Sequence, residues 1–221
     1  MSVRVRVWDL PTRLFHWLLA AAVLALIVTG KVGGNAMVWH LRLGLLVLAL
    51  LLFRVVWGFA GGHWSRFSSF VRGPLTVWRY LRAPRGSHDV AGHNPLGGWS
   101  VLAMLGALSA QVFTGLFADD EIATTGPLSA RASSGFVESA SHFHTGWGQW
   151  LVMGLIALHL AAILWHSLLG PEGLVGPMLS GDKLRDAHAG PVSRDTPASR
   201  LLALLLLALA LLLAAAVGWQ A

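Results

Sequence analysis

Four of the ten histidines lie at or inside long apolar segments, where an ionisable side chain is expensive to bury. They are His16, His40, His144 and His159. A neutral imidazole is a good ligand for a metal ion such as iron. Metal or cofactor binding is therefore the first chemistry to consider. The alternative for any single histidine is a hydrogen bond between helices, and that interpretation stays open here.

The composition places these histidines in a membrane. Of 221 residues, 55% are apolar and only 12% are charged, which is about half the charged share of a globular protein. The apolar residues form unbroken blocks of about 18 residues or more and do not alternate with polar ones, so we predict transmembrane helices. The chain has no cysteine. This excludes disulfides, thiolate zinc sites, cysteine-ligated iron–sulfur clusters and covalently attached c-type haem.

We predict an all-α integral membrane protein with five spans. A four-helix bundle occupies residues 1–183, a cytoplasmic linker residues 184–199, and a fifth transmembrane helix lies in residues 200–221. The fifth helix has no ionisable residue in its apolar run, and we assign it no chemistry. The predicted spans cover residues 14–30, 39–60, 96–118, 146–169 and 201–218.

The charged loops predict the orientation, because short cytoplasmic loops are enriched in Lys and Arg. Basic residues gather before the first span, after the second and after the fourth, so these three segments share the cytoplasmic side. The N-terminus is then cytoplasmic and the C-terminus outside. The net charge of +6 is loop charge of this kind and not a nucleic-acid surface. The opposite side carries the acidic residues Asp119, Asp120, Glu121 and Glu138.

The predicted spans arrange the histidines as two pairs by depth. His40 and His144 lie towards the outer side, and His16 and His159 towards the cytoplasmic side. The fifteen residues between His144 and His159 span about 22 Å and turn about 60° past four full turns. Each pair comes from two helices, which suits bis-axial ligation of haem iron in a dry bundle interior. Gly30 and Gly44 lack side chains at the outer level and can let a macrocycle approach.

Two alternatives to haem remain for these histidines. A zinc or copper site fits poorly, because two separated pairs come with no thiolate and no cluster of carboxylates. A haem-free membrane anchor or cation transporter is the other alternative. One optical spectrum of the reduced protein separates both from a cytochrome.

Two cytoplasmic segments have local predictions of their own. Residues 74–82 have the pattern of a short amphipathic helix on the membrane surface. Residues 171–199 are rich in Gly, Pro, Ser and charge and are predicted to be loop. Asp9 is predicted to cap the first helix, with Pro11 in its first turn, and the alternative is a role at a partner surface.

At these residues the sequence resembles the bacterial di-haem cytochrome b family, which includes cytochrome b561 and the cytochrome b subunit of nickel–iron hydrogenases. The resemblance covers about residues 7–183. Its most specific parts are Val7-Trp-Asp-Leu-Pro-Thr-Arg-Leu-Phe-His16-Trp17 and Gly92-His93-Asn-Pro-Leu-Gly-Gly98. The other matching stretches are His40-x-x-x-Gly44, Arg54-x-x-Trp57-Gly58-Phe59 with Arg66-Phe67, Thr114-Gly115-Leu-Phe117, and Leu158-His159.

The resemblance implies four helices that hold two b haems, with axial ligands from spans one, two and four. It carries ligation onto His16, His40 and His159. The family places its two span-four histidines fourteen residues apart, whereas His144 precedes His159 by fifteen. We favour His144 as the fourth ligand unless the span begins with an irregular turn. The competing ligands are His142 for His144 and His166 for His159.

The resemblance also implies a function in electron transfer. We expect a protein of the bacterial inner membrane that passes electrons between the quinone pool and an outer redox partner, either a cytochrome c or a hydrogenase-like enzyme. The alternative is an oxidoreductase that passes electrons from superoxide to quinone without a protein partner. Whether the chain is itself an enzyme stays open. Arginines near the cytoplasmic end of span two can pair with haem propionates, namely Arg54, Arg66 and Arg72.

Overall fold

The protein is described from a computed structural model, which covers residues 2–82, 91–169, 173–186 and 191–220. Arg85, one of the basic residues after the second span, lies outside these residues, as do the loop histidines His88 and His188, for which no role is predicted. Within them, five helices are long and apolar enough to cross a membrane, which confirms the predicted number of spans. The first four are α1 (Leu10–Val32), α2 (Met37–Ala60), α5 (Pro95–Gly115) and α7 (Gln149–Leu169), and the fifth is α9 (Pro197–Gly218).

The remaining elements are short and lie between or before these helices. The strands are β1 (Ser2–Arg6) and β2 (Asp182–Asp186). The short α-helices are α3 (Phe67–Phe70), α4 (Pro74–Arg82), α6 (Ser134–Phe143) and α8 (Val175–Ser180). The 3-10 turns are η1 (Gly34–Ala36), η2 (His63–Ser65) and η3 (Ser129–Arg131), and η4 (His144–Gly148) is a π-helical turn.

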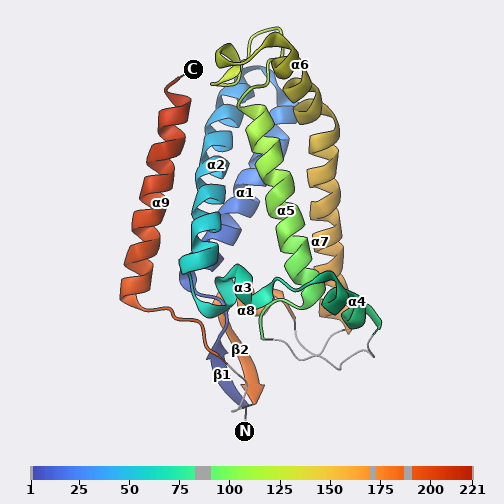
Figure 1. Cartoon of the computed structure of the whole chain (residues 1–221), viewed down its shortest axis with the longest axis vertical. Coiled ribbons are helices and arrows are strands. Elements are labelled where there is room, and N and C mark those ends of the chain that lie inside the picture. Colours follow the sequence, from blue (N-terminus) through green and yellow to red (C-terminus); the bar gives the residue numbers. More distant parts are fainter. Residues whose placement is uncertain (1, 83–90, 170–172, 187–190, 221) are drawn as a thin grey trace. The chain divides into compact units, whose positions relative to one another are not determined.

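The chain forms two compact units, each of which draws on several of the long helices. The sheet unit comprises Met1–Leu14, Arg54–Ala103 and Ala157–Leu204. The cavity unit comprises Phe15–Phe53, Met104–Ile156 and Leu205–Ala221. Both are shown in Figure 1, and each is described by itself.

The sheet unit is built around the carboxylate of Asp9, which is fully buried. Its Oδ1 accepts a hydrogen bond of 2.9 Å from the Thr12 backbone N–H, so Asp9 caps α1 as the sequence predicted. Its Oδ2 accepts bonds from the Gly62 N–H at 2.9 Å and the Ser65 hydroxyl at 2.7 Å. The Trp57 indole N–H donates to Oδ1 at 3.3 Å. The burial excludes the alternative role of Asp9 at a partner surface.

The two strands correct the prediction that residues 171–199 are loop. β1 and β2 pair antiparallel, with Ser2 opposite Asp186 and Arg6 opposite Asp182, and α8 precedes β2 (Figure 1). The segment Asp182–Asp186 has no hydrophobic alternation, because its partner strand comes from the far N-terminus of the chain. A pairing across such a sequence separation leaves no local signal.

Ion pairs connect the strands to the start of α9. The Arg6 guanidinium lies 2.9 Å from the Asp182 carboxylate and 3.4 Å from that of Asp195, and Arg200 lies 2.8 Å from Asp195. Burial raises the pKa of Asp195, but the hydrogen bond and charge of Arg200 and the charge of Arg6 outweigh it, so the pKa is lowered overall. Asp195 therefore stays ionised at neutral pH.

The predicted amphipathic helix at residues 74–82 is confirmed as α4. The Arg82 guanidinium carbon lies 3.7 Å from the centre of the Trp78 ring, so a cation covers one of its aromatic faces. Leu75, Trp78 and Leu81 remain exposed, as expected of a helix that meets lipid with one side.

The cavity unit has a continuous apolar core. Segments of α1, α2, α5 and α7 run side by side in it (Figure 1). Its best-buried members include Val47 of α2, which is fully buried, and Ala22 of α1, which is 4% exposed. The remaining core residues are Val23, Leu51, Ala107, Leu108, Val112 and Val152.

The helices begin and end at slightly different residues than the apolar blocks predict. α1 begins at Leu10, not residue 14, because the Asp9 cap precedes the apolar run. Span four is preceded by α6, and the π-helical turn joins α6 to α7. Because α6 carries polar residues, a hydropathy block could not reveal it.

Replacing Asp9 should destabilise the sheet unit far more than replacing a surface acid. We expect Asp9→Ala to lower the free energy of unfolding by at least about 2 kcal/mol, since it removes a helix cap and leaves buried donors unpaired. The thermal unfolding midpoint in detergent measures this. Asp182→Ala, which breaks a half-exposed ion pair, is the control and should cost under about 1 kcal/mol. Equal midpoints for the two variants would contradict the assignment.

Candidate functional site

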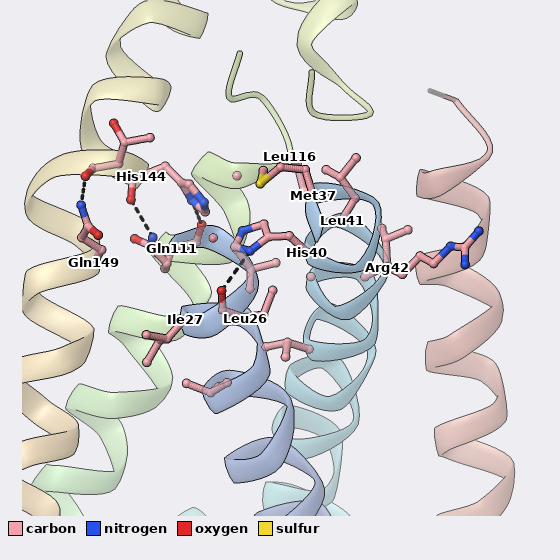
Figure 2. A pocket seen from close by; sticks show the side chains of 18 of the residues that line it. Leu26, Ile27, Met37, His40, Leu41, Arg42, Gln111, Leu116, His144 and Gln149 are labelled. Carbon is pink, nitrogen blue, oxygen red and sulfur yellow. Dashed lines mark hydrogen bonds between the residues drawn. The ribbon is translucent and has the colours of Figure 1, made fainter. Parts of the chain in front are cut away.

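The cavity unit holds a pocket of about 630 Å³ (Figure 2). This volume is typical of a site for a cofactor or other small molecule. Most of the lining is apolar, with a few polar groups at defined places. Its polar lining side chains are Lys31, His40, Arg42, Gln111, Thr125, His144, Thr145 and Gln149.

His40 and His144 point towards one another across this pocket, from α2 and from the first residue of the π-helical turn (Figure 2). Their ring centroids are 6.1 Å apart and their ring planes cross at 88°. The Nδ1 of His40 lies 3.0 Å from the Leu26 carbonyl, and the Nδ1 of His144 lies 2.8 Å from the Gln111 carbonyl. Because a carbonyl can only accept, each Nδ1 donates its proton.

This hydrogen bonding fixes the tautomer of both rings. A histidine whose Nδ1 carries the proton has a lone pair on Nε2, and a backbone carbonyl at Nδ1 is the usual support of a metal-ligating imidazole. A metal–nitrogen bond of about 2 Å to each ring, plus roughly 1 Å from nitrogen to ring centre, gives a centroid separation of about 6 Å. The 6.1 Å observed therefore fits one metal ion between the two rings.

The donor set fits haem better than a bare metal ion. Among the residues that the structure describes, no group of three or more His, Cys, Asp or Glu side chains could hold a metal ion. Zinc sites use three or four protein ligands. Haem supplies four nitrogen ligands itself and needs only two axial ones. Two facing histidines in an apolar pocket match that requirement.

Three glycines make room at this site. A Cβ on Gly30 would lie 3.0 Å from Cε1 of His40, and a Cβ on Gly115 would lie 2.7 Å from Cε1 of His144. A Cβ on Gly44 would meet nothing within 4 Å. All three line the pocket. Gly30 and Gly44 were predicted from their spacing to the histidines, whereas Gly115 was not, because it lies on another helix.

The structure distinguishes His144 from its competitor His142. His142 is exposed, while His144 is half-buried against α5. Span four does begin with an irregular turn, in which Gly146 has φ −101° and ψ −111°. A π-helical turn takes up about one residue more than an α-turn. The fifteen residues from His144 to His159 then turn the helix by about as much as fourteen regular residues do. The rotation between the two side chains is about 40° short of four full turns, instead of about 60° past them.

The other two predicted ligands, His16 and His159, belong to different units, and each is described within its own unit. His16 lies on α1 in the cavity unit, 5.0 Å from the Trp17 ring between centroids. His159 lies on α7 in the sheet unit and is half-buried. The pairing of His16 with His159 therefore stays a prediction from the sequence. His166 donates from Nδ1 to the Ala162 carbonyl one turn earlier, at 2.8 Å.

The three predicted arginines have different surroundings in the sheet unit. Arg54 is only 4% exposed, lies 4.9 Å from the Phe67 ring centre, and interacts electrostatically with Asp9. Its Nη1 is buried without a hydrogen-bond partner among the described residues. Arg66 donates to the Gly61 carbonyl at 3.0 Å, and Arg72 to the Ser69 carbonyl at 2.7 Å. Of these three arginines, Arg54 is the one with a buried donor that has no hydrogen-bond partner among the described residues.

Two of the four acidic residues build the loop after α5. Asp120 Oδ1 accepts hydrogen bonds from the backbone N–H groups of Ile122, Ala123 and Thr124, at 2.8 to 2.9 Å. The bonds from Thr124, Ala123 and Ile122 lower the pKa of Asp120 to about 2. Asp119 accepts from the Glu121 N–H at 2.8 Å. Both aspartates therefore stabilise the loop by hydrogen bonds, independently of any role in binding a partner protein.

The fifth helix reaches the pocket, which the sequence did not reveal. Gly218, the last residue of α9, is among the lining residues, and a Cβ there would lie 2.5 Å from Leu45 Cδ1 of α2. Ala210 and Ala214 precede it at four-residue intervals and are 4% and 2% exposed. Small residues at this spacing let two membrane helices approach closely. α9 therefore belongs to the wall of the site.

Comparison with known sequences identifies the family of this chain. A family model described as prokaryotic cytochrome b561 matches residues 7–181, which include all four predicted haem ligands. The chain belongs to this family. α9 lies beyond the matched residues. No solved structure matches the chain significantly.

The similar curated proteins are described as cytochrome subunits of hydrogenases. The "Probable Ni/Fe-hydrogenase B-type cytochrome subunit" of Cupriavidus necator (strain H16) is 27% identical over 209 residues, covering 79% of this chain and 85% of the relative. The "Probable Ni/Fe-hydrogenase 1 B-type cytochrome subunit" of Escherichia coli (strain K12) is 26% identical over 214 residues, covering 79% of this chain and 88% of the relative.

Family membership identifies the cofactor that this pocket fits. As a prokaryotic cytochrome b561 with five apolar helices, this is a multi-pass membrane b-type cytochrome of the bacterial inner membrane, and the family implies haem b. The facing imidazoles, their protonated Nδ1 atoms and the apolar lining meet the needs of that cofactor.

A side chain at Gly115 should disturb the cytochrome through His144. We expect Gly115→Ala to push the His144 ring out of place, because the new Cβ would lie 2.7 Å from its Cε1, and to lower the haem content measured by pyridine haemochrome. Gly106→Ala on the same helix α5, where a Cβ meets nothing within 4 Å, is the matched control and should leave the haem content unchanged. Equal haem loss in both variants would refute a role through His144.

Proposed function

We propose that this protein is a di-haem cytochrome that passes electrons between the membrane quinone pool and a hydrogenase-like partner on the outer side. The observation that carries the proposal is the His40–His144 pair, two imidazoles 6.1 Å apart with each Nδ1 held by a backbone carbonyl. Similarity to proteins described as hydrogenase cytochrome subunits supports this partner over a cytochrome c.

His40 and His144 are proposed as the axial ligands of the outer haem. For the inner haem we propose His16 and His159, on the strength of their depth and of the family resemblance. A bound haem would supply a one-electron couple at each level of the membrane. The protein holds the His40 and His144 imidazoles in the ligating tautomer and surrounds them with a mostly apolar lining.

Arg54 is proposed to neutralise a propionate of the inner haem. Its buried Nη1 is the support for this role, because a buried guanidinium donor is best satisfied by a carboxylate. Arg66 and Arg72 remain candidates for the same role, but each already donates to a backbone carbonyl, so we favour Arg54.

The orientation is proposed from the loop charges, with the N-terminus cytoplasmic and the C-terminus outside. In this orientation the His40–His144 pair lies towards the outer side. The loop after α5, with Asp119, Asp120 and Glu121, would then face the partner, together with Glu138 on α6. Asp120 stays charged over the physiological pH range, because its pKa is about 2.

Removing one ligand of the outer pair should remove one haem. We expect His40→Ala and His144→Ala each to reduce the haem content from about two to about one per chain, since a b haem needs both axial ligands. Pyridine haemochrome against protein concentration measures the ratio. His142→Ala and His166→Ala are the matched controls and should retain both haems. A colourless wild-type preparation would overturn the whole proposal.

Electron transfer should depend on both quinone and partner. We expect the reduced cytochrome in membrane vesicles to be reoxidised by added quinone, and reduction by hydrogen to require an added nickel–iron hydrogenase. Stopped-flow absorbance in the haem α band follows both steps. Glu121→Gln with Glu138→Gln should slow the reduction in a salt-dependent way, because exposed charges steer association.

One result would contradict the proposed hydrogenase-linked electron transfer, and another would contradict the proposed docking surface. Rapid reduction of the purified cytochrome by superoxide, with quinone as acceptor and no effect of the hydrogenase, would favour the superoxide:quinone oxidoreductase instead. Unchanged association kinetics in the double Glu variant would remove the acidic surface from the docking site and leave the haem proposal intact.

A further inference from the structure

Gln111 and His144 exchange two hydrogen bonds. The Gln111 side-chain Nε2 donates to the His144 backbone carbonyl at 2.8 Å, and the His144 Nδ1 donates to the Gln111 backbone carbonyl at 2.8 Å (Figure 2). One residue thus contacts both the main chain and the ring of the same histidine. Because α5 is a regular helix at this point, Gln111 presents both groups from a rigid element.

The contact is made where the fourth span departs from α-helical geometry. His144 begins the π-helical turn, and Gly146 within it has non-helical φ and ψ. Such a turn disturbs the regular ladder of backbone hydrogen bonds. The Gln111 amide donates to the carbonyl of the residue at which this disturbance begins. It thereby ties the irregular turn to α5.

Glycine at position 148 allows this approach. A Cβ on Gly148 would lie 2.1 Å from Gln111 Oε1, so the amide lies directly against the backbone of the turn. Oε1 itself is buried and has no hydrogen-bond partner among the described residues. A buried amide oxygen without a partner is costly. The two bonds to His144 are the contacts that offset this cost.

We propose that Gln111 is a positioning residue for the outer haem, holding both the main chain and the ring of His144 in the ligating orientation. The inference rests on the proposed function of His144 as an axial ligand. Gln111 does not touch the iron. It acts through His144, in the way that second partners of ligating histidines fix ring orientation and raise the basicity of the ligand.

The ring orientation has spectroscopic consequences. The planes of His40 and His144 cross at 88°, close to perpendicular. In a low-spin ferric haem the angle between the axial imidazole planes governs the anisotropy of the EPR signal, and perpendicular planes give the most anisotropic one. Loosening His144 would let its ring turn and would weaken the Nδ1 hydrogen bond. A less basic ligand stabilises ferric iron less, so the midpoint potential should rise.

The test uses the full-length holoprotein in detergent. Gln111→Met keeps the length of the side chain and removes the N–H donor, and Gln111→Ala removes the amide altogether. Ser109→Ala, an exposed residue on the same helix, is the matched control. The His40→Ala spectrum identifies which EPR signal belongs to the outer haem. We expect both Gln111 variants to shift that signal, raise the outer midpoint potential, and release haem about 10-fold faster.

The outcomes separate this inference from the function on which it rests. If the wild type contains about two haems and the Gln111 variants keep the outer EPR signal and potential of Ser109→Ala, Gln111 is not a positioning residue, although the cytochrome stands. If the wild type lacks haem, the proposed function fails first. If Gln111→Met folds poorly, Gln111→Asn, which keeps the donor on a shorter arm, must restore the wild-type signal in part; no recovery would overturn the inference.

Discussion

The His40–His144 site depends on two hydrogen bonds from imidazole Nδ1 atoms to main-chain carbonyls, one at Leu26 and one at Gln111. Each bond crosses from one helix to another and fixes which nitrogen carries the proton. A histidine in the other tautomer would present an N–H to the pocket and could not bind a metal there. The packing of α1 on α2, and of α5 on the start of span four, therefore decides the chemistry of the pocket.

The glycines of the pocket are a consequence of the same constraint. A carbonyl can reach an imidazole on a neighbouring helix only if the helices approach closely, and a Cβ on Gly30 or Gly115 would lie within about 3 Å of a ring. Gly148 has the same role for the Gln111 amide. The small residues of α9 belong with these glycines, since they bring a fifth helix against α2 beside the pocket.

The sheet unit has its own organising group in the carboxylate of Asp9. One buried side chain caps α1, holds the turn after α2 through Gly62 and Ser65, and receives the indole N–H of Trp57. These contacts come from segments about fifty residues apart in the chain. The stretch around Asp9 that resembles the cytochrome family thus has a structural reason for its residue types.

The sequence by itself determined the membrane location, the number of spans and the family, because these follow from apolar block length and from contiguous motifs. It also located His40 and Gly30, whose levels in the membrane can be counted along a helix. The tertiary structure shows that His144 lies opposite His40 in the pocket while His142 is exposed, which the sequence could not show because an irregular turn changes helical phase without a mark in the hydropathy. It alone revealed the β1–β2 pairing and the contacts of Gln111, Gly115 and Gly218 at the pocket, since each depends on residues distant in the chain.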